Sequence, residues 1–249
     1  MISRTLYSFS NVKINNSGVF AQSLNYNVNS AHEQIEEYGN DNFYSILSEP
    51  ITATCEISCY PGHNFGNLIK QLTDHTRSGS VRENVTTNFG SLDKALLSSF
   101  KMEAAVNSVP NASMTFIGAV STGETLSGCS SPEFMSGIVS TEDIKINNGS
   151  GQAQKVSMSW DIPVSPILSY SSSLSYPTSF FGEPLGTATV NIQAMNGEIG
   201  SISCIDFGRI NTTFSDIKVI SSGVNQAVGT MGATYNVSFQ CSANNVSFS

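Results

Sequence analysis

The segment CEISCYPGH places three common metal ligands, Cys55, Cys59 and His63, at intervals of four residues. Thiolate and imidazole groups bind zinc, so this spacing suggests a metal site. The residues around the two cysteines alternate between apolar and polar, which predicts a strand, and four residues of a strand span about 13 Å. Ligands of one zinc ion lie within about 2.3 Å of the metal. We therefore predict that both cysteines belong to the apolar face of a strand, and we expect no metal site and no cofactor.

Two other motifs suggest catalysis without completing it. HEQIE begins like the helix of a zinc protease, but Glu36 stands where the second histidine is required. DFG at residues 206–208 is similar to the magnesium-binding loop of protein kinases, but it lies in a β-rich stretch without the catalytic loop or glycine-rich loop of a kinase. A Ser–His or Cys–His site stays open as an alternative, although no nucleophile motif points to one. We expect that the protein is not an enzyme.

The composition excludes several classes of function. Of 249 residues only 12% are charged while 39% are hydrophobic, and the net charge is −8. Tight binding to the phosphates of nucleic acid needs clustered Lys and Arg, so we expect none. No apolar run approaches the roughly 18 residues that cross a bilayer, so we expect no membrane partner. Residues 2–5 do not resemble an export signal, and the five cysteines show no paired spacing, which predicts synthesis in a reducing compartment.

One phrase occurs twice in the chain. KINNSGVFAQS at 13–23 and KINNGSGQAQK at 145–155 agree at six of eleven positions and lie 132 residues apart (145 − 13). A duplicated strand should also keep its apolar residues in phase with period two. The phase holds for the apolar positions that follow the two phrases: Leu24, Tyr26 and Val28; Val156, Met158 and Trp160.

A second match pairs EPITATCEISCY (49–60) with EPLGTATVNIQAM (183–195). The offset is 134 and then 135, and we attribute the extra residue to Gly186, which predicts a β-bulge. The alternating pattern gives each copy an apolar face: Ala53, Cys55, Ile57 and Cys59; Ala188, Val190, Ile192 and Ala194. It also gives each a polar face: Thr54, Glu56 and Ser58; Thr189, Asn191 and Gln193.

The copies differ after this strand. NFGNLIKQL has apolar residues at i, i+3, i+4 and i+7, which predicts an amphipathic helix with Asn64 as its cap, whereas the second copy has only NGEIGS. SLDKALLSSF has helical propensity, but aligning FKM (100–102) with IKV (217–219) at an offset of 117 favours a strand. The last strands alternate alike: Met114, Phe116, Gly118 and Val120; Tyr235, Val237, Phe239 and Cys241.

These matches predict two tandem β-rich domains, residues 1–130 and 131–249, connected by the Gly-, Ser- and Pro-containing stretch 122–142. Each copy also contains a segment of about 20 residues between its first two matched strands, 29–48 and 163–182. Connections of that length exceed ordinary hairpin loops and usually serve interactions.

The phrase ending in AQS, the long segment, the P-x-x-x-T strand (50–54) and the helix together resemble bacteriophage tail tube proteins. The resemblance implies a mainly β chain of two tandem β-sandwich or partial-barrel domains, with one short helix packed on the first. It also implies self-association into rings, as a trimer of two-domain chains or a hexamer. The rings would stack into a tube in the virion tail, assembled in the host cytoplasm beside other tail proteins, and DNA would pass through without sequence-specific binding.

A conduit for DNA should not hold phosphate, so the two polar faces are candidate channel walls. The candidate lumen-facing residues are Thr54, Glu56, Ser58, Thr189, Asn191 and Gln193. The resemblance also implies that the long segments contact the adjacent ring. The candidate contacts are Glu33, Glu36, Glu37, Tyr170 and Tyr176. The alternatives are a tube-like adaptor of the neck or baseplate, or a capsid-decorating or carbohydrate-binding module in which the two tyrosines stack on sugar rings.

Overall fold

We describe the chain from a computed structural model. It describes residues 10–15, 17–29, 32–36, 43–47, 51–62, 65–79, 82–87, 89–106, 108–121, 145–147, 153–167, 179–195, 199–208, 210–226 and 233–249. We refer to residues 10–121 as the first half and to residues 145–249 as the second half.

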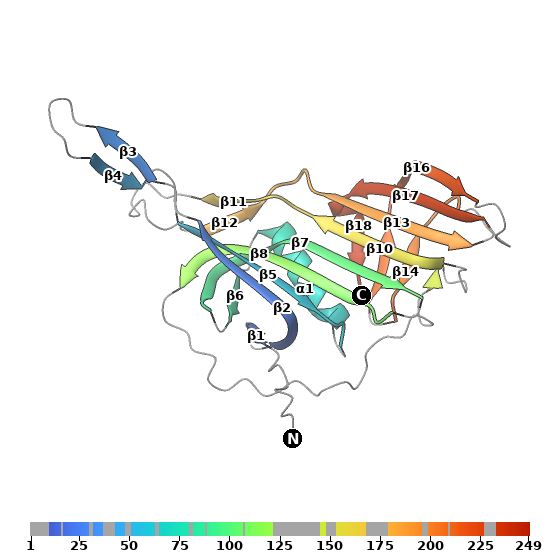
Figure 1. Cartoon of the computed structure of the whole chain (residues 1–249), viewed down its shortest axis with the longest axis horizontal. Coiled ribbons are helices and arrows are strands. Elements are labelled where there is room, and N and C mark those ends of the chain that lie inside the picture. Colours follow the sequence, from blue (N-terminus) through green and yellow to red (C-terminus); the bar gives the residue numbers. More distant parts are fainter. Residues whose placement is uncertain are drawn as a thin grey trace, which may run out of the picture.

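The protein is mainly β, as the sequence predicts, with one α-helix in the described residues (Figure 1). The first half contains β1 (Ser10–Ile14), β2 (Ser17–Asn29), β3 (His32–Glu36), β4 (Phe43–Leu47), β5 (Thr52–Cys59), α1 (Phe65–Ser78), β6 (Glu83–Thr86), β7 (Ser91–Ala105) and β8 (Asn111–Ser121). The second half contains β9 (Lys145–Ile146), β10 (Ala153–Asp161), β11 (Val164–Ile167), β12 (Ser179–Gly182), β13 (Thr187–Met195), β14 (Cys204–Asp206), β15 (Asn211–Phe214), β16 (Lys218–Asn225), β17 (Thr234–Ser242), the 3-10 turn η2 (Ala243–Asn245) and β18 (Val246–Phe248).

Eight strands form a continuous antiparallel sheet that runs through both halves. Their order is β2-β5-β8-β7-β10-β13-β17-β16, and the sheet passes from one half to the other where β7 pairs with β10 (Figure 1). In the register of that junction Phe100 lies opposite Trp160, and Met102 lies opposite Met158. The two halves are therefore joined by backbone hydrogen bonds as well as by side-chain packing.

Smaller strands cover one face of this sheet. In the first half, β1 and β6 connect β2 to the beginning of β7, so the strand pairings run from β7 through β8, β5, β2, β1 and β6 back to β7 and the sheet curls strongly. In the second half, β9, β14, β15 and β18 form a separate four-stranded sheet. One hydrophobic core lies beneath these layers and includes residues of both halves, among them the fully buried Trp160 and Phe100.

The alternating faces predicted from the sequence for β5 and β13 are confirmed. Ala53, Cys55, Ile57 and Cys59 are all fully buried, and their counterparts from Ala188 to Ala194 are at most 3% exposed. Burial raises the pKa of the Cys55 and Cys59 thiols to about 12, so both remain neutral members of the core near neutral pH.

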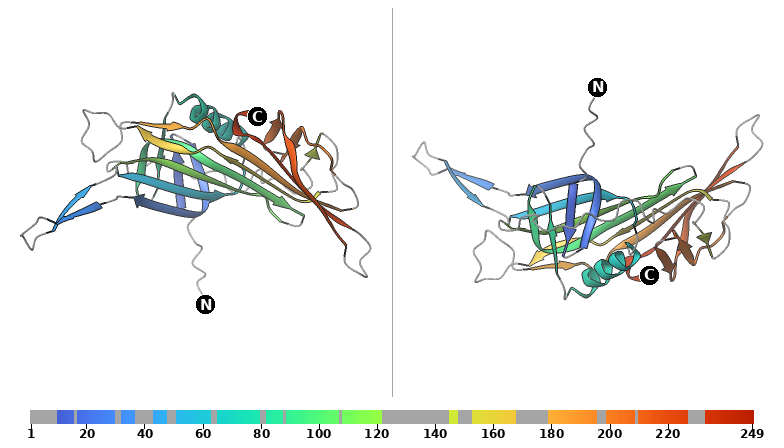
Figure 2. Two further views of the ribbon diagram at one scale, coloured as in Figure 1. Left: turned by 90° about the horizontal axis from the view of Figure 1, so that it is seen from above. Right: turned by 90° about the horizontal axis from the view of Figure 1, so that it is seen from below.

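The predicted helix is also confirmed, but it packs on both halves rather than on the first alone. Phe65, Ile69 and Leu72 are buried on one face of α1. Near its end, the Arg77 guanidinium donates hydrogen bonds to the carbonyl oxygens of Ala243 (2.7 Å) and Val246, and it lies 5.7 Å from the centre of the Trp160 ring. In every view α1 lies beside the C-terminal strand (Figures 1 and 2).

The second half repeats the topology of the first. The order β2-β5-β8-β7 corresponds to β10-β13-β17-β16, and each half has a separate two-stranded hairpin, β3–β4 or β11–β12. The registers agree as well: Tyr26 lies opposite Cys55 as Met158 lies opposite Val190. These pairs keep the offsets of 132 and 135 that the sequence matches predict (158 − 26 and 190 − 55).

The irregular positions repeat too. In the described residues, the non-glycine positions with a left-handed backbone fall into two pairs, Asn15 with Asn147 (φ 52° and 53°) and Lys94 with Asp216 (φ 55° and 50°). The Asn15 side-chain oxygen accepts a hydrogen bond from the Asn84 amide (2.9 Å), as that of Asn147 does from the Ser203 amide (2.7 Å). Asn tolerates this conformation better than most residues, which explains why the repeated phrase contains it.

Ladder shifts also occur at matching places. The β2–β5 ladder shifts between residues 21 and 23, and the β10–β13 ladder shifts between 153 and 155, an offset of 132. The β7–β8 ladder shifts between 97 and 99, and the β16–β17 ladder shifts between 219 and 221, an offset of 122. Bulges set the twist of the neighbouring strands, so their repetition indicates that both halves bend alike.

Several details of the sequence alignment are wrong. FKM does not match IKV at an offset of 117, because Leu97 and Val219 occupy equivalent positions, an offset of 122 (219 − 97). Likewise Phe116 corresponds to Phe239, so the last strands match at 123 rather than 121. The counterpart of β7 is divided into β15 and β16. Because residues are inserted between these two strands, the alternation of apolar and polar residues alone does not give the correct alignment.

Gly186 is not a bulge. It precedes β13, and a Cβ there would lie 2.5 Å from Ile162 Cγ1 and 2.6 Å from the Asp161 carbonyl oxygen. Close approach of the chain therefore explains this glycine. The segments 29–48 and 163–182 also differ from the plain loops that the sequence suggests, because each contains a strand pair. Asn64 and His63 lie outside the described residues.

Candidate assembly interface

The first edge of the eight-stranded sheet is β16. In the described part of the chain, β16 pairs with β17 and with no other strand. All eight of its residues are exposed, and three of them are apolar: Val219, Ile220 and Val224, which are 46%, 55% and 59% exposed. An unpaired strand edge with exposed apolar side chains is a template for pairing with another chain.

The second edge is the outer part of β2. Its beginning pairs with β1, but the ladder from Ser23 to Asn29 has only β5 beside it in the described residues. Leu24 and Tyr26 pack against the core, whereas Val28 on the same face is 51% exposed. The Tyr26 hydroxyl donates a hydrogen bond to the Ser91 carbonyl oxygen (3.2 Å), and burial, with a smaller contribution from Cys55, raises the pKa of Tyr26. This part of β2 is therefore hydrogen-bonded to β5 along one side and unpaired along the other in the described residues.

The two free edges are the equivalents of two strands that already pair within the chain. By the offset of 132, β2 corresponds to β10, and by the offset of 122, β16 corresponds to the last part of β7. β7 and β10 pair with each other from Ser99–Asp161 to Ala105–Lys155. A second copy can therefore place its β2 beside β16 in the same way that β10 lies beside β7.

The internal register gives the register of this contact. The offset of 122 converts a β7 residue to its equivalent in β16, and the offset of 132 converts a β10 residue to its equivalent in β2. The pair Phe100–Trp160 then corresponds to Ser222 opposite Val28 of the next copy, and the pair Met102–Met158 corresponds to Val224 opposite Tyr26. The internal side chains are at most 2% exposed, so their equivalents would become buried. The contact between copies would have smaller apolar side chains than the internal one. The internal contact also includes Arg77 of α1, and this residue has no counterpart because no helix is described between β13 and β14. We therefore expect it to be weaker than the junction within the chain.

The candidate lumen-facing residues lie on one continuous face. Thr54, Glu56 and Ser58 are on the face of β5 opposite the core, and Thr189, Asn191 and Gln193 are on the corresponding face of β13. Cross-strand neighbours connect the two sets through β8, β7 and β10. The charged side chains of this face include both signs: Glu56, Glu103 and Asp161; Lys101, Lys155 and Lys218. The face therefore carries charges of both signs, although the net charge of the chain is −8.

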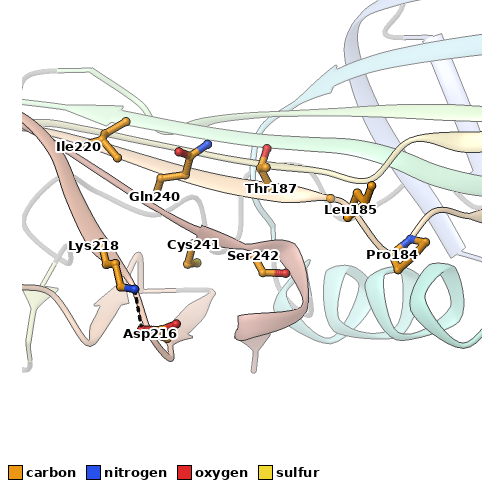
Figure 3. Close-up of a pocket in the computed structure, with 10 residues that line it drawn as sticks. Pro184, Leu185, Thr187, Asp216, Lys218, Ile220, Gln240, Cys241 and Ser242 are labelled. Carbon is orange, nitrogen blue, oxygen red and sulfur yellow. Dashed lines mark ion pairs between the residues drawn. The ribbon is translucent and has the colours of Figure 1, made fainter.

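An open pocket of about 510 Å³ lies at the beginning of β16 (Figure 3). It is lined by Pro184, Leu185, Gly186, Thr187, Asp216, Lys218, Ile220, Gln240, Cys241 and Ser242. Lys218 and Asp216 form an exposed ion pair (3.6 Å) on one side of it. Burial, with a smaller contribution from Asp216, raises the pKa of the Cys241 thiol to about 11. Apart from this ion pair the pocket has uncharged walls, and it offers no activated nucleophile.

The candidate contacts in the long segments are only partly placed. Glu33 and Glu36 lie in β3, opposite Ile46 and Phe43 of β4. Glu37, Tyr170 and Tyr176 lie outside the described residues. No group of three or more metal-ligating side chains occurs in the part of the chain that the structure describes, and no described helix is long and apolar enough to cross a membrane.

The sequence reasoning missed β16 as an interface. The signal was the exposed apolar run Val219-Ile220, which the misaligned offset assigned to a strand with a buried face.

Comparison with known proteins does not place the chain in a family, because no family model matches the chain and no curated protein shows significant similarity.

Proposed function

We propose that this protein is a structural subunit that joins head to tail with copies of itself into rings, which stack into the DNA-conducting tube of a bacteriophage tail. The single observation that carries the proposal is the equivalence of the two free edges, β16 and β2, to the paired strands β7 and β10. A head-to-tail contact of this kind closes into a ring when its rotation permits. Closure would also remove both exposed edges.

The repeated topology, registers and bulges support an origin by tandem duplication, with units near 1–130 and 131–249. If each junction between copies imitates the junction within the chain, a ring of three chains contains six similar units. Three chains also supply 24 strands (3 × 8) to one continuous sheet. We propose the trimer rather than the hexamer on the dimensions that follow.

Strand geometry fixes the size of such a ring. Twenty-four strands about 4.8 Å apart and tilted by about 40° close into a cylinder about 48 Å across at the backbone. Side chains would reduce the bore to roughly 38 Å, which admits one DNA duplex of about 20 Å. Six chains would double the diameter and leave a bore far wider than a duplex.

The polar face would line this bore. It is rich in Ser, Thr and Asn, and its charges are mixed, as in the ion pair between Lys155 and Glu103. A wall without a basic cluster gives phosphates no site of strong attachment, so DNA could move along it. The opposite face of the sheet covers the core and would lie outward.

Negative-stain electron microscopy of the purified protein over a range of concentrations tests the proposal. We expect rings or tubes with a bore of about 35–40 Å and three chains per ring by mass measurement. Rings that never stack would favour the neck or baseplate adaptor. Monomers that persist at the highest concentrations would refute the proposal.

A further inference from the structure

We propose that the pocket at the beginning of β16 receives the β3–β4 hairpin of the neighbouring copy in the same ring. This inference rests on the proposed function and names a second contact between the same two copies. It differs from the expectation that the long segment reaches an adjacent ring.

The first argument is the position of the equivalent hairpin. β11–β12 crosses from the second half onto the first, where Phe180 is fully buried in a cluster with Leu96 and Ala119. The Ile162 amide donates to the Ser98 carbonyl oxygen (2.8 Å), so the chain remains attached to β7 as it enters this hairpin. Contacts of β12 with α1 and β7 hold the hairpin there.

The second argument is that the pocket occupies the equivalent surface. Leu96 pairs with Ile117 in the β7–β8 ladder, as Lys218 pairs with Gln240 in the β16–β17 ladder. Ala119 corresponds to Ser242 by the offset of 123. Lys218, Gln240 and Ser242 all line the pocket, which nothing in the described chain covers (Figure 3).

The third argument is that β3–β4 pairs with no other strand in the part of the chain that the structure describes. It forms a two-stranded sheet of its own, at the opposite end of the molecule from β16 (Figures 1 and 2). It follows β2 directly, so a copy that pairs its β2 with β16 brings this hairpin to the pocket. β10 brings β11–β12 onto the first half by the same geometry.

The fourth argument is charge. The side chains clustered under β11–β12 are apolar, with one hydrogen bond from Arg82 to the Ser179 hydroxyl at the start of β12 (3.0 Å), and residues 164–182 contain no charged residue. In the pocket Lys218 replaces Leu96, and residues 32–47 contain three glutamates and an aspartate. Receptor and hairpin thus both gain charged residues, and Lys218, whose ion pair with Asp216 is exposed, is the side chain of the pocket that can pair with a hairpin carboxylate.

Cross-linking between two variants, Ser45→Cys and Lys218→Cys, tests the inference; both are made in a background that still forms rings and in which the five native cysteines, including Cys241 in the pocket, are replaced by alanine. Ser45 corresponds to Phe180 by the hairpin registers, because Ser45 lies opposite Gln34 as Phe180 lies opposite Pro166. The full-length variants are mixed, assembled and treated with a short bismaleimide. The matched control replaces Ser45→Cys by Ser108→Cys, which lies between β7 and β8, away from the hairpin.

We expect a cross-linked dimer from the first mixture and at least tenfold less from the control. In the double variant, contacts within a ring end in a covalent trimer, whereas contacts between rings produce a ladder of larger species. A ladder, or no cross-link while rings form normally, overturns the inference and leaves the proposed function intact. Absence of rings in the unmodified protein overturns both.

Discussion

The substitution Val224→Asp should weaken assembly strongly while leaving the single chain stable. Val224 is 59% exposed in the chain, but its internal equivalent, Met102, is only 1% exposed where β7 meets β10. Burying the remainder of a valine contributes about 1–2 kcal/mol. An unpaired carboxylate at the same place adds a further desolvation cost of at least about 1.5 kcal/mol.

Together these effects weaken each contact by about 3 kcal/mol, or roughly 150-fold in dissociation constant. Sedimentation velocity across a concentration series measures the shift, and thermal unfolding at a concentration below assembly measures the stability of the single chain. We expect the latter to change by less than about 0.5 kcal/mol, because the site is exposed. Val109→Asp, at a 48% exposed position between β7 and β8, is the matched control and should assemble as the unmodified protein does.

Assembly of the Val224→Asp variant at the unmodified concentration would refute the reasoning, because a charge cannot be buried at the contact without cost. A designed pair makes the test stricter. Ser222 is expected opposite Val28 of the next copy, so Ser222→Asp and Val28→Lys should each weaken assembly. Their combination should restore part of it.

Three further predictions concern the single chain. Lys94→Gly should raise the free energy of unfolding by about 0.5–1 kcal/mol, measured by urea denaturation, because the backbone there is left-handed (φ 55°); an unchanged or lower value would contradict this. Glu83→Ala should lower it by about 2–4 kcal/mol, since the carboxylate is 1% exposed and accepts from Asn15 and His75, whereas the exposed Glu103→Ala should cost little. Burial raises the pKa of Cys55 and Cys59 from about 9 to about 12. The neutral thiols therefore contribute fully to the free energy of unfolding below pH 9, and this contribution is lost as pH rises towards 12. Cys59→Ala should flatten that decline in thermal scans, and an unaltered pH profile would count against the assignment.

The strand faces could be predicted from the sequence because burial on one side of a strand imposes alternation. Cys55 and Val190, for example, were assigned to the core by period alone and are fully buried. The repeated phrase was informative for a second physical reason. Asn15 and Asn147 both adopt the left-handed backbone that asparagine tolerates, so the same turn required the same residue.

The junction between the halves could not be predicted in this way. Periodicity shows which side chains of β7 are buried, but not that β10, some fifty residues away, pairs with it. The edge strand β16 was misaligned because a bulge at Ile220 and the division of β15 from β16 shift its phase. The position of α1 depends on the contact between Arg77 and Trp160. These residues lie far apart in the sequence, and no local pattern indicates that they meet.

The central claim is that the eight-stranded sheet continues from β16 of one copy into β2 of the next. Amide hydrogen exchange, read by mass spectrometry of peptides from assembled protein and from the dispersed Val224→Asp variant, measures this most directly. The account predicts that residues 222–226 and 24–29 become strongly protected on assembly, while β5 and β13, which pair on both edges in the single chain, change little. Assembled protein in which both edge strands still exchange as fast as in the dispersed variant would contradict it.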